Sequence, residues 1–141
     1  MVNRLAVFIF VCLFVSGCAP TSLDDYRHEG EAVGREILID LQKIRTRDDL
    51  VQGEMRLKKK FEKLVSLIID ARIFTLDHPD LESFTPSAID MEVSQLLKME
   101  MERVYSIEGG REIIEKAQRE AMLRLDGFEK AREKQKKLRI K

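Results

Sequence analysis

Apolar residues recur at helical spacing along four stretches of the chain, and polar segments or segments with glycine and proline separate these stretches. Within each stretch the apolar positions are spaced by threes, fours and sevens, which places them on one face of an α-helix. The sequence has no strand-like alternation and no internal repeat. Amphipathic helices with short connections bury their apolar faces by packing together. The pattern therefore predicts an all-α fold, an antiparallel bundle of about four helices.

The expected core consists of the inward-facing residues of these four stretches. They are Tyr26, Val33, Ile37, Leu41 and Ile44, then Leu50, Leu57, Phe61, Leu64, Ile68 and Ala71, then Ile89, Val93, Leu97, Met101 and Val104, and finally Ile114, Ala117, Ala121, Leu125 and Phe128. Leu67 and Ile69 widen the second stripe. We therefore expect the second helix to be the most buried of the four.

Local signals indicate where these helices begin and end. Residues 46–49, Thr-Arg-Asp-Asp, are typical of a capping box, with the threonine as the N-cap and acidic residues in the first turn. Thr85 followed by Pro86 predicts the start of the third helix, because proline suits the first position of a helix but not its interior. The glycine pair at 109–110 is expected to end that helix. The Asp-Gly pair at 126–127 leaves two alternatives open: the fourth helix stops there, or it continues into the basic residues beyond.

The beginning of the chain has a different pattern. Arg4 precedes an unbroken apolar run from Leu5 to Val15, and small residues follow the run. A basic start, a short apolar stretch and small residues before a cleavage site are typical of a secretory signal peptide. A transmembrane helix needs about 20 apolar residues, whereas a run of about 10–14 is more typical of a signal peptide. We therefore expect residues 1–17 to be a signal peptide that is removed.

Val15-Ser16-Gly17-Cys18 resembles the lipobox of bacterial lipoproteins, in which an aliphatic residue and two small ones precede a cysteine. The resemblance implies that the Cys18 thiol receives diacylglycerol, that signal peptidase II cuts after Gly17, and that the new amino group is acylated. No other cofactor is expected. The alternative is an ordinary secretory signal with a chance cysteine at its end. The next residue, Ala19, is not the aspartate that retains lipoproteins in the inner membrane of some bacteria, so the resemblance favours the outer membrane.

Removal of the signal peptide leaves 124 residues, in which charge is unevenly distributed. The expected organisation is a lipidated linker at residues 18–22, a helical domain at 23–128 and a basic C-terminal tail at 129–141. The tail has seven basic and two acidic side chains, whereas residues 18–128 have seventeen basic and twenty-three acidic ones. A nearly neutral, exported chain is not expected to bind nucleic acid. Because Cys12 lies in the removed segment, the mature domain has no free thiol and no disulfide.

Candidate catalytic and metal-binding residues are few. His78 lies among acidic residues of a loop, but the cluster lacks the paired-ligand spacing of metal sites, and a solvated loop is the favoured interpretation. Glu29, Glu36 and Asp40 share a helical face, yet a di-metal bundle also needs Glu-x-x-His motifs, which the sequence lacks. Nucleophile elbows, phosphate loops and dinucleotide fingerprints are absent as well. The sequence predicts no enzyme, no metal site and no small-molecule substrate.

Two further groups of residues have both a structural and a functional interpretation. Met91, Met99, Met101 and Met122 could line a binding groove, but methionine more often fills gaps in a helical core, which is the role that we expect. Residues 56–60, Arg-Leu-Lys-Lys-Lys, are expected to place their lysines on a solvated face.

The basic tail supplies the candidate contact residues Lys134, Lys136, Lys137, Arg139 and Lys141. The simplest interpretation is a frayed helix end, where cations suit the helix dipole. The functional interpretation is contact with anionic lipid, peptidoglycan or an acidic protein partner. Lys141 also resembles the final lysine that joins the helical major murein-linked lipoprotein to peptidoglycan, although the present chain is longer and is interrupted by prolines and glycines.

With the lipobox resemblance, these features predict a membrane-anchored lipoprotein of the bacterial cell envelope. Its helical domain is expected to be non-enzymatic and to display an interaction surface. The alternative is an envelope structural element that links the membrane to peptidoglycan through the basic tail.

Overall fold

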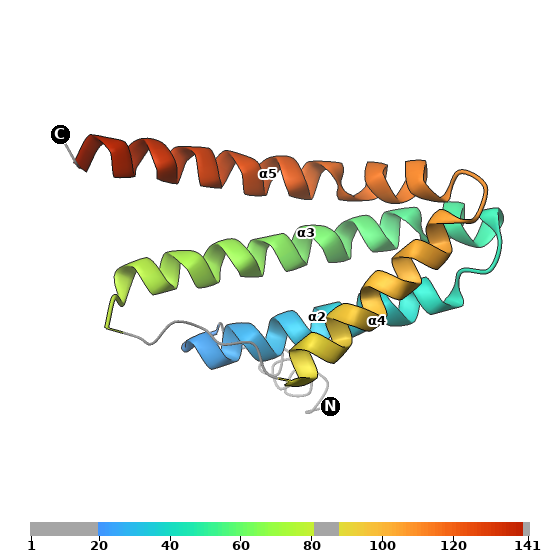
Figure 1. The fold of residues 1–141 in the computed structure, drawn as a ribbon, viewed down its shortest axis with the longest axis horizontal. Coiled ribbons are helices and arrows are strands. Elements are labelled where there is room, and N and C mark those ends of the chain that lie inside the picture. The colour runs from blue at the N-terminus through green and yellow to red at the C-terminus, as the bar shows by residue number, and fades with distance from the viewer. Residues whose placement is uncertain (1–19, 81–87, 140–141) are drawn as a thin grey trace, which may run out of the picture.

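Four α-helices form the regular structure of the described part of the chain (Figure 1). The computed structural model describes residues 20–80 and 88–139. The helices are α2 (Leu23–Lys43), α3 (Arg47–Asp77), α4 (Ala88–Tyr105) and α5 (Gly110–Arg139). No strand occurs in these two ranges, and the helices pack against one another. The predicted all-α bundle of four helices is confirmed.

Successive helices run in opposite directions, but the largest interface joins helices that are not neighbours in sequence (Figure 1). α3 lies between α2 and α5 and packs most extensively against α5, which runs in the same direction. α4 packs mainly against α2, makes no contact with α3, and diverges from α5 away from the turn that joins them (Figure 1). The bundle is therefore closed at the end where the α2–α3 and α4–α5 turns lie, and open at the opposite end.

The starts of α2 and α3 are stabilised by the same local motif. In α3, the Thr46 hydroxyl accepts a hydrogen bond from the Asp49 N–H at 3.2 Å, and the Asp49 carboxylate accepts one from the Thr46 N–H at 2.9 Å. This is the capping box predicted at residues 46–49. Ser22 and Asp25 form the same reciprocal pair at the start of α2, a cap that we did not predict.

The two capping carboxylates are stabilised in their charged form. The pKa of Asp25 is lowered, chiefly because the Thr21 N–H donates to it at 2.9 Å and further because of hydrogen bonds with Ser22. The pKa of Asp49 is lowered in the same way, chiefly by the Arg45 N–H, which donates to it at 3.0 Å. Both capping boxes are therefore most stable when these two carboxylates are ionised.

The buried core is concentrated toward the closed end. Its members are Val33, Ile37, Leu41, Ile44, Leu50, Leu57, Phe61, Val65, Leu67, Ile69, Val104, Ile114, Ala117 and Ala121. α3 supplies more of them than any other helix, as expected, because it is covered on two sides by α2 and α5.

Several residues that we expected in the core are only half-buried. They are Tyr26, Leu64, Ile68, Ala71, Val93, Leu97, Met101, Leu125 and Phe128. They lie toward the open end on α2, α3 and α5, and along the diverging part of α4 (Figure 1). The side chain of Ile89 is outside the described residues. The degree of burial falls where the helices separate.

The buried stripe of α3 was predicted wrongly over its second half. It continues from Phe61 through Val65 and Ile69, whereas Leu64 and Ile68 are half-buried. Because α4 makes no contact with α3, Leu64 and Ile68 line a hollow instead of the closed core.

The prediction that methionines fill the core is wrong for three of the four. Met91, Met99 and Met122 are exposed, and Met101 is half-buried. The reason is the openness of the bundle: α4 is covered on one side by α2, and Met122 lies on the outer side of α5.

The turn between α4 and α5 uses both glycines of the pair. Gly109 adopts a φ of +73°, a conformation that favours glycine, and a Cβ on Gly110 would collide with the carbonyl oxygen of Val104. α4 ends at Tyr105, and α5 begins at Gly110. The glycine pair therefore lies at the start of α5, whereas we expected it to end the preceding helix. The predicted N-cap of the third helix at Thr85 lies outside the described residues.

Candidate functional site

The open end of the bundle brings together the start of α2 and the ends of α3 and α5 (Figure 1). Cys18, the predicted lipid attachment residue, lies outside the described residues. α2 begins at Leu23, so the five steps from Cys18 to Leu23 span at most about 18 Å even when fully extended. A lipid on Cys18 would therefore hold this end of the bundle close to a membrane. No helix among residues 20–80 and 88–139 is long and apolar enough to cross a membrane itself.

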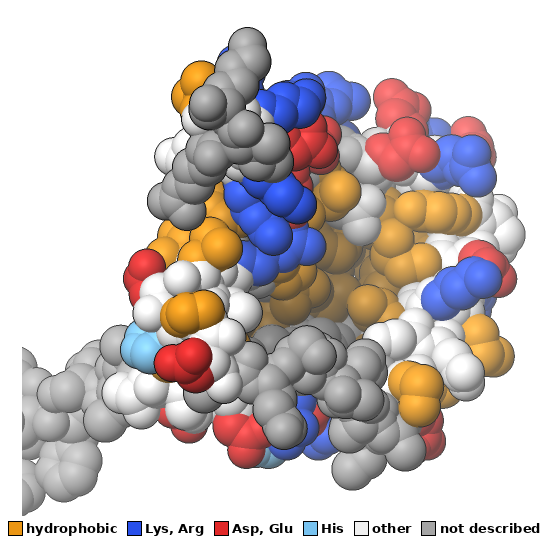
Figure 2. Space-filling model, turned by 60° about the vertical axis from the view of Figure 1, so that its left-hand side comes forward, with side chains coloured by type: hydrophobic (Ala, Val, Ile, Leu, Met, Phe, Trp, Pro, Cys, Tyr) orange, Lys and Arg blue, Asp and Glu red, His pale blue; other side chains and the backbone are white. Residues whose placement is uncertain are grey.

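An apolar groove lies between α2 and α3 at this end, with a volume of about 380 Å³. We call it the α2–α3 groove. It is lined by Leu23, Tyr26, Arg27, Gly30, Leu64, Leu67, Ile68, Ala71, Arg72 and Thr75. Figure 2 shows the open end as a hollow with hydrophobic side chains across its inner surface and basic side chains along one edge. The groove exposes apolar surface that a closed four-helix bundle would bury.

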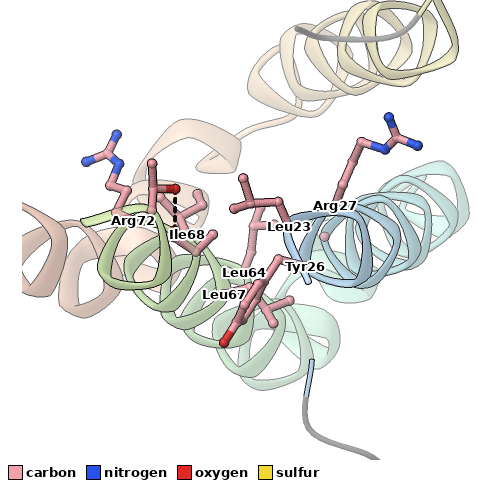
Figure 3. Close-up of a pocket in the computed structure, with 10 residues that line it drawn as sticks. Leu23, Tyr26, Arg27, Leu64, Leu67, Ile68 and Arg72 are labelled. Atoms are coloured by element: carbon pink, nitrogen blue, oxygen red, sulfur yellow. Dashed lines mark hydrogen bonds between the residues drawn. The ribbon is translucent and has the colours of Figure 1, made fainter. Parts of the chain in front are cut away.

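The walls of the α2–α3 groove come from side chains that point into the space between the two helices. In Figure 3, Leu23 of α2 and Leu64 of α3 extend toward one another, whereas Tyr26 lies beside Leu67. The lining has two hydroxyls: that of Thr75 donates to the Ala71 carbonyl of its own helix at 2.9 Å, and the other belongs to Tyr26. The interior of the groove therefore offers apolar contact and little hydrogen bonding.

Two arginines flank the apolar walls. Arg72 of α3 forms an ion pair with Glu129 of α5. Arg27 of α2 lies 3.1 Å from Asp24 and 3.8 Å from Glu31. The 3.8 Å contact with Glu31 is made by the Arg27 Nε, which is shielded from solvent. Both arginines are therefore already paired with carboxylates of the domain.

Gly30 lies in the interior of α2 and lines the groove. No atom outside its own helical turn lies within 4 Å of the position that a Cβ would take there. Glycine in a helix interior costs about 0.5–1 kcal/mol relative to alanine. The structure gives no packing reason for this glycine, and its lack of a side chain keeps the groove open.

The basic tail is a direct continuation of α5. The helix runs without interruption through residues 126–127 to Arg139, so the second of the two alternatives is the observed one. Lys134, Lys136 and Lys137 are exposed and form no ion pair with the described residues. The side chain of Arg139, and all of Lys141, lie outside what the structure describes. The tail is at the same end of the bundle as the α2–α3 groove (Figure 1).

The three carboxylates considered for a di-metal site pair instead with cations of α3. Glu29 lies 3.1 Å from Lys63, and Asp40 lies 2.7 Å from Lys60, which also lies 3.5 Å from Glu36. They form an inter-helix ladder of ion pairs that ties α2 to α3. Among the described residues no three histidine, cysteine or acidic side chains are grouped as metal ligands would be.

The prediction of a solvated face for the basic run at 56–60 is only partly correct. Lys59 is exposed, but the Lys60 side chain is mostly buried by its pairing with α2. Lys58 lies 2.8 Å from Glu120 of α5; this contact raises the pKa of Lys58 and lowers that of Glu120. The reason is that α3 is central, so lysines within this run reach acidic residues on both neighbouring helices.

His78 has a structural position at the end of α3. Its Nδ1 lies 2.9 Å from the Phe74 carbonyl oxygen, and its ring stacks on the Phe74 ring with 4.3 Å between centroids. His78 is the C-cap residue of the helix, and its backbone N–H also bonds to Phe74. These contacts place His78 in the cap at the end of α3.

The features that sequence reasoning missed are the α2–α3 groove and its flanking arginines. The only signal in the sequence was Gly30, an interior helix glycine without a turn to explain it. The open end can hold apolar groups within the groove and attract anions to its basic residues. Comparisons with protein-family models, curated proteins and solved structures find no match to this chain.

Proposed function

We propose that this protein is a membrane-anchored lipoprotein of the bacterial cell envelope, in which a non-enzymatic helical domain displays an interaction surface. The observation that carries the proposal is Val15-Ser16-Gly17-Cys18 directly after the apolar run from residue 5. Cysteine is needed at this place because its nucleophilic sulfur takes the lipid as a thioether. Two or more acyl chains hold a protein stably at a membrane, whereas one chain binds only marginally.

The arrangement of the domain supports a function at a membrane surface. The start of α2 and the basic end of α5 lie at the same end of the bundle (Figure 1). An anchor on Cys18 would bring Lys134, Lys136 and Lys137 toward the anionic headgroups of the bilayer. Each basic residue near such a surface contributes about 1 kcal/mol. The outer membrane is the favoured location because Ala19 follows the cysteine.

A second candidate function is a structural link between the membrane and peptidoglycan. The observation that favours it is the unbroken α5, which carries exposed basic side chains as far as Arg139. In that case the tail would contact the acidic groups of peptidoglycan instead of lipid headgroups. Co-sedimentation of the purified protein with peptidoglycan sacculi separates the two functions, because only the second requires binding there.

Mass spectrometry of the protein from native membranes tests the proposal. The expected species begins at Cys18 and carries diacylglycerol and an amide-linked acyl chain. Cys18→Ala should give an unlipidated precursor, because no other cysteine remains after cleavage. Cys12→Ala is the matched control and should be processed normally, since Cys12 lies within the removed segment. A membrane-bound protein with its Met1 end intact would overturn the proposal.

A further inference from the structure

The α2–α3 groove is too large to be a packing defect. Protein interiors contain few voids larger than a water molecule. The groove has a volume of about 380 Å³, and sites for small molecules have volumes of about 300–1,000 Å³ and mostly apolar walls. An open hollow of this size has the dimensions and apolar walls of a site for a small apolar group.

The glycine at position 30 independently supports a binding role for the groove. A leucine or alanine at this position would favour helix formation more than glycine does. The space beside Gly30 is empty to 4 Å, so packing within the protein does not demand glycine there. A larger side chain would instead extend into the groove that Gly30 lines. The absence of a side chain at Gly30 therefore leaves this part of the groove open.

The shape and chemistry of the groove select a linear hydrocarbon. Its α3 wall extends from Leu64 to Thr75, about 16 Å at the rise of an α-helix. A polar ligand would need several convergent donors and acceptors inside the groove. Apart from the two arginines, the polar groups of the lining are the Thr75 hydroxyl, which already donates to Ala71, and the Tyr26 hydroxyl. A single acyl chain fits this combination.

The charged surroundings suit an anionic headgroup at the groove opening. Arg27 and Arg72 flank the apolar walls, and their guanidinium groups extend outward from the groove in diverging directions (Figure 3). Lys134 and Lys137 add unpaired positive charge at the same end. A phosphate could accept hydrogen bonds from an arginine and compete with the present carboxylate partners, because such charge-assisted bonds are strong.

We propose that the α2–α3 groove binds one acyl chain of an anionic membrane phospholipid, with the headgroup phosphate at the opening that Arg27 and Arg72 flank. The proposal rests on the proposed function for the source of the lipid, since an anchor on Cys18 would hold the groove within about 18 Å of a bilayer. A membrane phospholipid is favoured over the acyl chains of Cys18 itself. Withdrawing one of those chains into the groove would weaken the anchor that two or more chains provide.

Photo-crosslinking in vesicles tests the proposal. The full-length protein is reconstituted into phosphatidylcholine vesicles that contain phosphatidylglycerol with a diazirine in one acyl chain, and crosslinked peptides are located by mass spectrometry after illumination. We expect the label on the α2 and α3 segments that contain Tyr26 and Ile68. Labelled phosphatidylcholine should react less, because it carries no net negative charge. Equal labelling by the two lipids would overturn the assignment of an anionic headgroup.

Two glycine variants provide a matched pair. Gly30→Leu places a side chain in the groove, whereas Gly127→Leu makes the same change at an exposed position of α5 where a Cβ also meets nothing within 4 Å. Both changes favour the helix, so both variants should fold. Gly30→Leu should reduce groove labelling about tenfold, which corresponds to about two methylene groups excluded from the groove. Gly127→Leu should leave labelling unchanged, and equal labelling of the two variants would overturn the proposal.

The Cys18→Ala full-length chain separates this proposal from the proposed function. If the wild-type protein carries no lipid on Cys18, the proposed function fails, but the groove of Cys18→Ala mixed with labelled vesicles should still react. If Cys18→Ala reacts and the lipidated wild-type protein does not, the groove holds the protein's own acyl chain, and the assignment to a membrane phospholipid is wrong. Absence of groove labelling in both proteins would overturn the groove proposal while leaving the anchor intact.

Discussion

The Arg103 side chain of α4 donates a hydrogen bond from Nη2 to the carbonyl oxygen of Leu41 at 2.7 Å. Its Nη1 donates to the Ile44 carbonyl oxygen at 2.8 Å, and its Nε lies 2.7 Å from the Glu100 carboxylate. The carbonyls at the end of a helix lack partners within the helix. The Arg103 guanidinium therefore caps the end of α2 from another helix. The Glu100 carboxylate, one turn earlier in α4, orients this guanidinium.

Arg103→Ala should lower the free energy of unfolding by about 1–3 kcal/mol, because it removes the side-chain donor of the Ile44 carbonyl and leaves the Leu41 carbonyl with the Ile44 N–H alone. Arg103→Lys should recover only part of the loss, since lysine has no planar fork. Urea unfolding followed by circular dichroism measures both. Arg111→Ala is the control: Arg111 is exposed and its carboxylate partner Glu115 is 4.0 Å away. If the Arg103 and Arg111 variants lose the same stability, the cap has no energetic role.

The different burial of Phe61 and Leu64 leads to a second prediction. Phe61 is buried in the core, and Phe61→Ala should cost about 3–5 kcal/mol. Leu64 is half-buried beside the groove, so Leu64→Ala should cost about 1 kcal/mol. Lys59→Ala, on the exposed side of the same helix, should stay within about 0.5 kcal/mol.

These stability measurements use residues 20–141 made without lipid, after circular dichroism has established that the domain is largely helical. The order of the three losses is the decisive result. A loss at Leu64 as large as that at Phe61 would mean that the groove is packed shut in solution.

The capping boxes predict how stability depends on pH. The folded-state pKa of Asp25 and of Asp49 lies below the ordinary value of 3.8. Each ionised carboxylate therefore contributes stability that is fully present above that ordinary pKa and is lost as the pH falls through the lower, folded-state value. Thermal unfolding between pH 6 and about pH 2 should show a decline that begins near pH 4.

The double variant Asp25→Asn with Asp49→Asn should be less stable at neutral pH and should show a smaller decline in acid. Asp70→Asn, at an exposed position of α3 without a capping hydrogen bond, should leave the decline unchanged. An acid decline of equal size in the double variant and in the wild-type domain would place the responsible carboxylates elsewhere.

Removal of residues 134–141 tests the basic tail without disturbing the bundle. The cut retains Glu129, which pairs with Arg72, and it removes exposed residues such as Lys136 and Lys137. The unlipidated domain without them should bind anionic vesicles more weakly at low salt but should keep its stability. Binding by the intact domain should weaken as salt rises, because the Debye length falls from about 10 Å at 0.1 M to about 3 Å at 1 M. If both forms bind alike at low salt, the tail is only a solvated helix end.

The parts of the fold that could be predicted from the sequence are those encoded locally. Thr46 and Asp49 are three residues apart and interact within one turn, so their capping box is visible in the sequence. The choice between Leu64 and Val65 depends on where α5 and α4 lie, which no local pattern reports. The sequence does not distinguish Arg103 from the other basic residues of the chain, which has 25. Its capping role depends on the end of α2 lying beside it in the fold. The groove likewise results from the divergence of whole helices.

The parallel pairing of α3 with α5 determines the order in which the chain can acquire its structure. Ser66 and Arg124, whose side chains meet at 2.8 Å, are 58 residues apart in sequence. The hairpin of α2 and α3 can form early from local contacts, but one side of α3 stays uncovered until the last helix has been made. An uncovered apolar side on a partly made chain favours aggregation, so a chain delivered N-terminus first depends on the prompt arrival of α5. Truncations within α5 should therefore reduce the yield of folded protein more than equally long truncations at the start of α2.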